Sequence, residues 1–107
     1  MTVLTIDDAS FRARESLWHV LHTTARSQVA VMILAPGEAS SGGPSVHPTQ
    51  DQLLYLIEGE VEAEVGGERQ TLRAGQLAVV PAGTPHRFIN TGSVPARTLN
   101  VYAPPAY

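Results

Sequence analysis

The segment GQLAVVPAGTPHRFIN, residues 75–90, decides the fold of this chain. LAVV is a short run of β-forming side chains, and the PAGTP that follows has the fixed and permissive backbones that a tight turn between strands needs. His86 therefore stands at the start of the next strand. Because side chains alternate along a strand, His86, Phe88 and Asn90 are expected to share one face.

Apolar runs of strand length alternate with turn signals along the rest of the chain. The glycine pair between EAEV and ERQTL is the strongest signal for a β-hairpin. The expected strands are 17–21, 28–34, 53–57, 61–65, 70–72, 77–80, 87–90 and 98–102. This spacing predicts an all-β, single-domain double-stranded β-helix, a jelly-roll barrel, with a short helical or irregular N-terminal segment within 8–16.

Length and composition narrow the class of protein. A chain of 107 residues is expected to form one domain, residues 1–107. The formal net charge of −3, without a run of like charges, argues against a nucleic-acid partner or a membrane anchor. No stretch resembles a signal peptide or reaches transmembrane length, so a cytoplasmic protein is expected. Without cysteine or lysine, thiolate metal sites and Schiff-base chemistry are excluded.

The expected strand 53–57, LLYLI, is apolar on both faces. A strand with one solvated face should alternate apolar and polar side chains, so both of its faces are expected to be covered. The cover of the second face could be the other sheet, the N-terminal segment or a second subunit. Because closed twofold assemblies are the commonest oligomers, this pattern predicts a homodimer.

The spacing G-x5-P-x-G-x2-H-x3-N within residues 75–90 resembles the second conserved motif of the cupins. Upstream, SVHPTQDQLLYLIEG partly resembles the first cupin motif, H-x-H-x(3,4)-E-x6-G. His47 stands at the second histidine position of that motif and Gln52 at the glutamate position. Ser45 replaces the first histidine. One expected histidine and the carboxylate are therefore missing.

The resemblance implies a metal site built from His47, Gln52 and His86, with Ser45 as a weak fourth candidate. Neutral imidazoles bind Zn, Mn, Fe, Co or Ni, and an amide oxygen is a weaker ligand than a carboxylate. Such a site leaves positions open for water and substrate. The alternative is that the barrel has lost its metal and that His47 is a histidine of a surface loop.

Residues 20–105 as a whole resemble small bacterial single-domain cupins, the cupin_2 group that is often described only as mannose-6-phosphate isomerase-like; the barrel is expected at about 28–104. A weaker resemblance is to small cupins that linearise unsaturated uronates. Where their last strand carries Asp-x-Phe, this chain has Asn100 and Tyr102. Both are candidates for the pocket, although an amide cannot transfer protons as a carboxylate does.

Two classes of function follow. The first is a metal-dependent enzyme of isomerase, lyase or dioxygenase type that acts on a small polar metabolite such as a sugar acid or keto acid. The second is a non-catalytic module that binds or senses a small molecule without metal. Most of the carboxylates lie in turns or on the expected strand 61–65 and its flanks, so no acid-base pair is visible in the sequence.

Overall fold

The computed structural model describes residues 1–11 and 18–107. The described elements are one short 3-10 helix followed by a series of strands. They are η1 (Asp8–Phe11), β1 (Trp18–Thr23), β2 (Gln28–Leu34), β3 (Asp51–Glu58), β4 (Glu60–Val65), β5 (Glu68–Arg73), β6 (Leu77–Val80), β7 (His86–Asn90) and β8 (Ala96–Ala103). Within these described ranges, no helix is long and apolar enough to cross a membrane.

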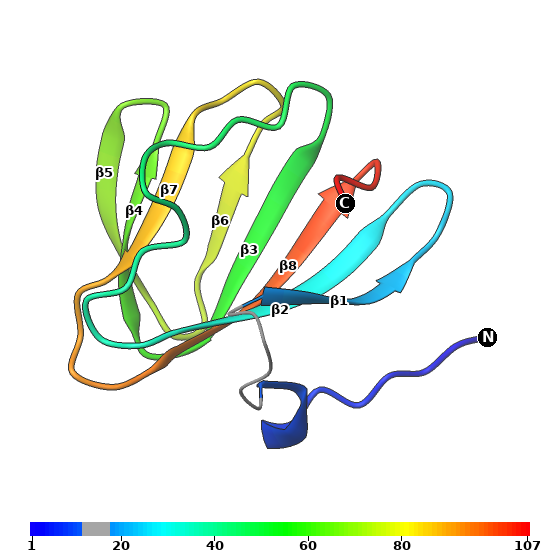
Figure 1. Ribbon diagram of the computed structural model, residues 1–107, viewed down its shortest axis with the longest axis horizontal. Helices are drawn as coiled ribbons and strands as arrows, with labels where there is room; N and C mark the ends of the chain where they lie inside the picture. The colour runs from blue at the N-terminus through cyan, green and yellow to red at the C-terminus, as the bar shows by residue number, and fades with distance from the viewer. Residues whose placement is uncertain (12–17) are drawn as a thin grey trace.

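The strands form two antiparallel sheets that face each other (Figure 1). The larger sheet has the order β1-β2-β8-β3-β6, and the smaller has the order β5-β4-β7. Neighbours such as β2 and β8 are far apart in sequence, as in a jelly roll. The prediction of an all-β jelly-roll barrel is therefore confirmed.

Side chains from the inner faces of both sheets form one hydrophobic core. Leu54 and Leu56 of β3 are fully buried, as are Leu34 of β2 and Val61 of β4, and Phe88 of β7 is 1% exposed. Alternation along each strand sends every second residue into this core. The same alternation places a few polar side chains inside the barrel, where they form the pocket described below.

The expected strands agree closely with the observed ones. Strands 28–34 and 77–80 have the predicted bounds, and the others are one or two residues longer at an end than expected. The expected N-terminal helix within 8–16 is observed as the 3-10 helix Asp8–Phe11, and residues 12–16 lie outside the described residues, as does Leu17 of the first expected strand.

The outer face of β3 differs from the prediction. In this single chain Leu53, Tyr55 and Ile57 are 37%, 40% and 38% exposed, while the alternating residues Leu54 and Leu56 are buried. Of the three covers that were considered, neither the other sheet nor the described N-terminal residues bury this face, and a second subunit stays a prediction. The described part of the chain leaves the outer face open to solvent.

Candidate metal and ligand site

The turn between β6 and β7 fixes the backbone around His86. Gly83 adopts a φ of 78°, which favours glycine, and the Thr84 amide closes the turn on the Pro81 carbonyl at 3.1 Å. The Gly83 amide also donates to the carbonyl of His47 at 2.8 Å. One turn therefore places the backbones of both predicted histidine ligands.

The His86 side chain is buried and held in one orientation. It is 4% exposed and points inward at the start of β7, as predicted. Its Nδ1 lies 3.0 Å from the Thr84 carbonyl oxygen. Because a carbonyl can only accept a hydrogen bond, Nδ1 carries a proton, and in the neutral ring the lone pair is then on Nε2. A metal-binding histidine needs the same arrangement.

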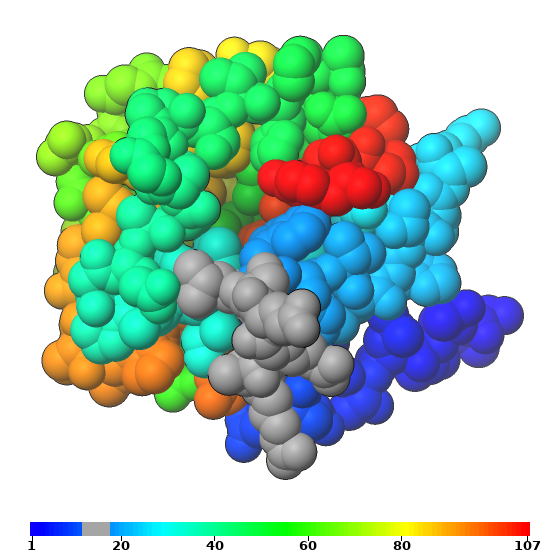
Figure 2. Space-filling model, in the orientation of Figure 1, coloured from blue at the N-terminus to red at the C-terminus, as the bar shows by residue number. Residues whose placement is uncertain are grey.

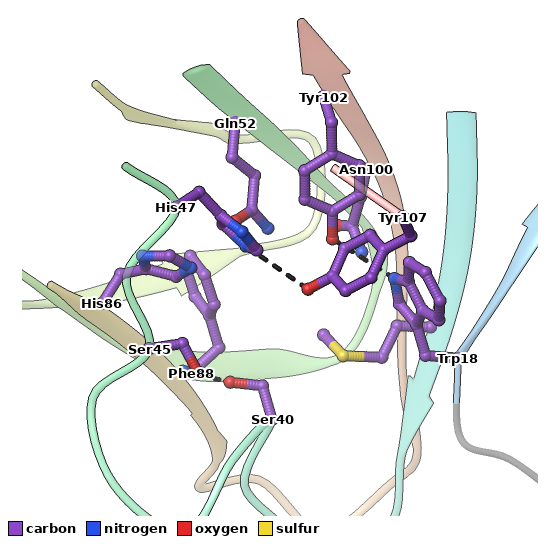
Figure 3. A pocket seen from close by; sticks show the side chains of 11 residues that line it. Trp18, Ser40, Ser45, His47, Gln52, His86, Phe88, Asn100, Tyr102 and Tyr107 are labelled. Carbon is purple, nitrogen blue, oxygen red and sulfur yellow. Dashed lines mark hydrogen bonds between the residues drawn. The ribbon is translucent and has the colours of Figure 1, made fainter. Parts of the chain in front are cut away.

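His47 reaches the same space from the segment that precedes β3. Its ring centroid lies 5.1 Å from that of His86, and its Nε2 lies 3.4 Å from the hydroxyl of Tyr107 (Figure 3). Burial, and then the neighbouring His86, hold the pKa of His47 below its usual value. The imidazole is therefore neutral at pH 7, the form that binds metals.

Gln52 supplies the third donor. Its side chain points inward from β3 and is 4% exposed, and its Oε1 is buried without a hydrogen-bond partner. An unsatisfied buried carbonyl costs about 1–3 kcal/mol, so a water molecule or an ion is expected to bind this atom. Asp51 faces the opposite way, as predicted: it is exposed, and its Oδ1 accepts from the Ala82 amide at 2.9 Å.

Ser45 contributes to the site mainly through its backbone. Its amide donates to the His86 carbonyl at 2.8 Å, and its carbonyl accepts from the His86 amide at 2.9 Å. This isolated bridge ties the segment before β3 to β7. The Ser45 side chain lines the same pocket as His47, Gln52 and His86, where the first cupin motif has a histidine.

The four candidate ligands open onto a cavity of about 240 Å³. Its remaining walls are largely aromatic, with two further polar side chains. They are Trp18, Met32, Ser40, Phe88, Asn100, Tyr102 and Tyr107. Among the described residues that line it there is no carboxylate and no guanidinium.

Asn100 and Tyr102 share the inner face of β8, as their spacing predicts. Asn100 is 1% exposed and its Oδ1 accepts from the Thr98 hydroxyl at 3.2 Å. The Tyr102 hydroxyl accepts from the Trp18 indole at 3.2 Å. Burial, and then the neighbouring Tyr107, raise the pKa of Tyr102, so its phenol stays protonated and can act as a hydrogen-bond donor.

The sequence analysis missed Trp18 and Tyr107. The Trp18 ring packs against that of Tyr107 with centroids 4.3 Å apart, although Trp18 begins β1 and Tyr107 follows β8. Trp18 is the chain's single tryptophan, and this was the one feature of the sequence that could have marked it as a residue of the site. Tyr107 follows the last strand and belongs to no motif.

No group of three or more His, Asp or Glu side chains within residues 1–11 and 18–107 is placed to hold a metal ion. A metal at this site would therefore need the Gln52 amide beside the two imidazoles. The chemistry of the donors fits such an ion, because two imidazole side chains and one unsatisfied carbonyl oxygen line one cavity.

Comparison with known proteins identifies a protein family whose sequences this chain matches. The family model "Cupin domain" matches residues 30–102. The uncharacterized protein YrkC of Bacillus subtilis is 36% identical over 98 residues, which cover 86% of this chain and 50% of YrkC. The tetracenomycin polyketide synthase protein TcmJ of Streptomyces glaucescens is 41% identical over 71 residues, covering 66% of this chain and 46% of TcmJ.

Solved structures agree with the sequence matches. The crystal structure of BH2720 from Bacillus halodurans superposes with a TM-score of 0.88 and 30% identity, and the match covers 99% of this chain and 83% of that one. This chain spans about half the length of the two curated relatives named above. The matched residues include the turn, both histidines and the strands β3 and β7, and the chain belongs to the cupin family.

Proposed function

We propose that the protein binds one divalent metal ion through His47, Gln52 and His86, and that the ion binds an oxygen of a small ligand in the cavity. The observation that carries this proposal is the Gln52 Oε1, a buried acceptor without a partner beside two imidazoles. Zn, Mn, Fe, Co and Ni are the candidate ions. A bound ion would supply Lewis acidity toward a carbonyl or enolate oxygen.

The walls of the cavity restrict the ligand. A volume of about 240 Å³ suits a small metabolite. The described lining offers hydroxyl and amide groups and aromatic faces but no guanidinium, so an acidic group of a sugar acid or keto acid would have to bind the ion itself. Isomerase, lyase and dioxygenase chemistry at such an oxygen are the reaction types we consider.

A non-catalytic binding module is the second candidate. It is favoured by the described lining, which contains no carboxylate to transfer protons. The raised pKa of Tyr102 points the same way, because a phenol that stays protonated donates a hydrogen bond without acting as a base. An enzyme should convert a carbonyl metabolite when loaded with metal, whereas a binding module should be stabilised by it without turnover.

The test of the metal proposal is the metal content of the untagged protein. We expect close to one divalent ion per chain in the wild type, and loss of that ion in His47→Ala, Gln52→Ala and His86→Ala. His22→Ala is the matched control, because His22 is an exposed histidine of β1. A wild type that is metal-free and takes up none of the five ions at micromolar concentration would contradict the proposal.

We propose further that the outer face of β3 and β6 binds a second copy of this chain. Leu53 pairs with Val79, and Tyr55 pairs with Leu77, so four large apolar side chains stand together on one face. Leu77 and Val79 are 52% and 58% exposed. Apolar patches of this kind mark protein interfaces, and a twofold copy covers a face with its own equivalent.

Sedimentation velocity tests this assembly. We expect a dimer for the wild type and a monomer for Tyr55→Glu, since a buried carboxylate opposite its own copy is costly. Thr71→Glu is the control, because Thr71 is exposed on β5 in the other sheet and should leave the dimer intact. A monomeric wild type at micromolar concentration would rule the assembly out.

A further inference from the structure

The residues after β8 turn back over the mouth of the cavity. Figure 2 shows this segment, in red, at the surface beside β1 and the start of β3. Gln28, which is 1% exposed, anchors it: its Nε2 donates to the Tyr107 carbonyl at 2.7 Å, and its Oε1 accepts from the amides of Ala106 and Tyr107 at 3.2 and 3.0 Å. A buried side chain thus fixes the position of the segment.

The anchored segment directs the Tyr107 side chain into the cavity. Its ring packs against Trp18 at 4.3 Å and against Tyr102 at 5.2 Å between centroids. Its hydroxyl reaches the His47 Nε2 at 3.4 Å, and Figure 3 shows this contact crossing the cavity between the aromatic wall and the imidazole. With the proton of the neutral His47 ring on Nδ1, the phenol donates to Nε2, which is the His47 atom that faces the proposed metal.

An imidazole nitrogen has one lone pair, which can accept a hydrogen bond or bind a metal but not both. We propose that Tyr107 is a competing occupant of the metal site, and that an ion binds His47 only when the Tyr107 hydroxyl is displaced. This inference rests on the proposed function. It adds that the segment 104–107, held by Gln28, lowers the affinity of the site for metal.

Displacement of Tyr107 is compatible with the rest of the fold. Tyr107 is 62% exposed, so its ring can leave the cavity without opening the hydrophobic core. The core residues of β3 and β7 belong to the two sheets and do not depend on the segment after β8. The segment can therefore act as a strap that lies over the site and moves when the ion enters.

The decisive variant is Tyr107→Phe, which keeps the ring and removes the hydroxyl. Titration of untagged, metal-stripped protein with Zn²⁺ should show about five-fold tighter binding than the wild type, the worth of one net hydrogen bond. Thr71→Val, which removes an exposed hydroxyl from β5 in the other sheet, is the matched control and should bind as the wild type does. Equal binding by Tyr107→Phe and wild type would overturn the inference.

A decrease in the Zn²⁺ affinity of Tyr107→Phe would be equally informative. If Tyr107→Phe binds Zn²⁺ more weakly, the phenol is a ligand of the ion and not its competitor, and the inference is wrong. If neither protein binds Zn²⁺ or the other four ions, the proposed metal site itself fails. The failure of the strap and the failure of the metal site are thus distinguishable.

Trp18 provides a readout that does not depend on activity. It is the only tryptophan of the chain, and it contacts the ring that should move. Zn²⁺ should change its fluorescence in the wild type, and the change should disappear in His47→Ala. Gln28→Leu, which removes the anchor of the strap, should also tighten Zn²⁺ binding. An emission that is unchanged when Zn²⁺ is bound would show that Tyr107 stays in place.

Discussion

The two histidines of the site are held in opposite ways. His86 begins a strand, is 4% exposed, and has its ring fixed by the carbonyl of Thr84 two residues away. His47 lies in an irregular segment, is half-buried, and its ring contacts the hydroxyl of a residue 60 positions away. The orientation of the His86 imidazole is set before a ligand binds. The His47 imidazole must instead exchange its contact with the Tyr107 hydroxyl for a contact with the ligand. We call His86 with the turn before β7 the fixed wall of the site, and His47 with Tyr107 the adjustable wall.

Gln52 offers the strongest test of this comparison, because its side chain lines the same cavity as both histidines. Gln52→Glu restores the carboxylate of the first cupin motif in a position that is 4% exposed. Without metal, the buried charge should cost about 2–3 kcal/mol of unfolding free energy. With metal, the same charge should raise the affinity about ten-fold or more, since a carboxylate is a better ligand than an amide.

Urea unfolding in the presence of chelator and of Zn²⁺ measures both effects of Gln52→Glu. Gln70→Glu, at an exposed position of β5, should change neither quantity. If Gln52→Glu is as stable as the wild type in chelator, the side chain is not in a dry environment. If its affinity for Zn²⁺ does not rise, Gln52 is not a ligand.

The fixed wall depends on the turn before β7. Gly83 has a φ of 78°, and a Cβ there would meet no atom within 4 Å, so Gly83→Ala should act through the backbone alone. We expect it to lower the unfolding free energy by about 1–2 kcal/mol. Gly43→Ala, in the segment before β3, is the control: its Cβ also meets nothing, its φ is not positive, and a change below about 0.5 kcal/mol is expected.

Thermal or urea unfolding of the two glycine variants is sufficient to measure this difference. Equal stabilities would mean that the turn can relax around an alanine. His86 would then be less firmly placed than its contacts indicate, and the contrast between the two walls would be lost.

The same contrast explains what could be predicted from the sequence. The turn, the inward direction of His86 and the outward direction of Asp51 all follow from neighbours within a few residues, so strand alternation and turn chemistry suffice to predict them. The strands 28–34 and 77–80 were predicted with their bounds for the same reason.

The adjustable wall could not be predicted in this way. Tyr107 contacts His47 and Trp18, which are distant from it in the sequence, and neither its residue type nor its spacing marks it. Gln28 is a polar residue at the start of an apolar strand, which could have been noticed, but its partners in the segment after β8 lie 78 and 79 positions away. Contacts between distant positions leave no periodic signal in a single sequence.

Asp51 links β3 to the turn and allows a smaller test. Its Oδ1 accepts from the Ala82 amide at 2.9 Å at an exposed position. Asp51→Ala should lower the unfolding free energy by about 1 kcal/mol, as expected for one hydrogen bond to a charged group at the surface. Asp51→Asn keeps an acceptor of the same shape and should recover most of the loss. If the two variants are equally destabilised, the charge matters and the bond to Ala82 does not.

The smallest effect concerns pH and the adjustable wall. The pKa of His47 in the fold is lowered from the 6.5 of an unfolded chain, because burial and the neighbouring His86 disfavour its charged form. Above pH 6.5 both states are neutral and His47 has no effect on stability. As the pH falls below 6.5, the unfolded chain takes up a proton before the folded chain does, so stability is lost.

In chelator, the urea midpoint of the wild type should therefore decrease between pH 7.5 and pH 5.5, and the decrease should be smaller in His47→Gln. His22→Gln, at the exposed histidine of β1, should keep the slope of the wild type. The slope is the informative quantity, because His47→Gln also removes the contact with Tyr107 at every pH. The slopes of the urea midpoint against pH could instead coincide for wild type and His47→Gln. The fold would then not oppose protonation of His47, and His47 would be more open to water than its contacts imply.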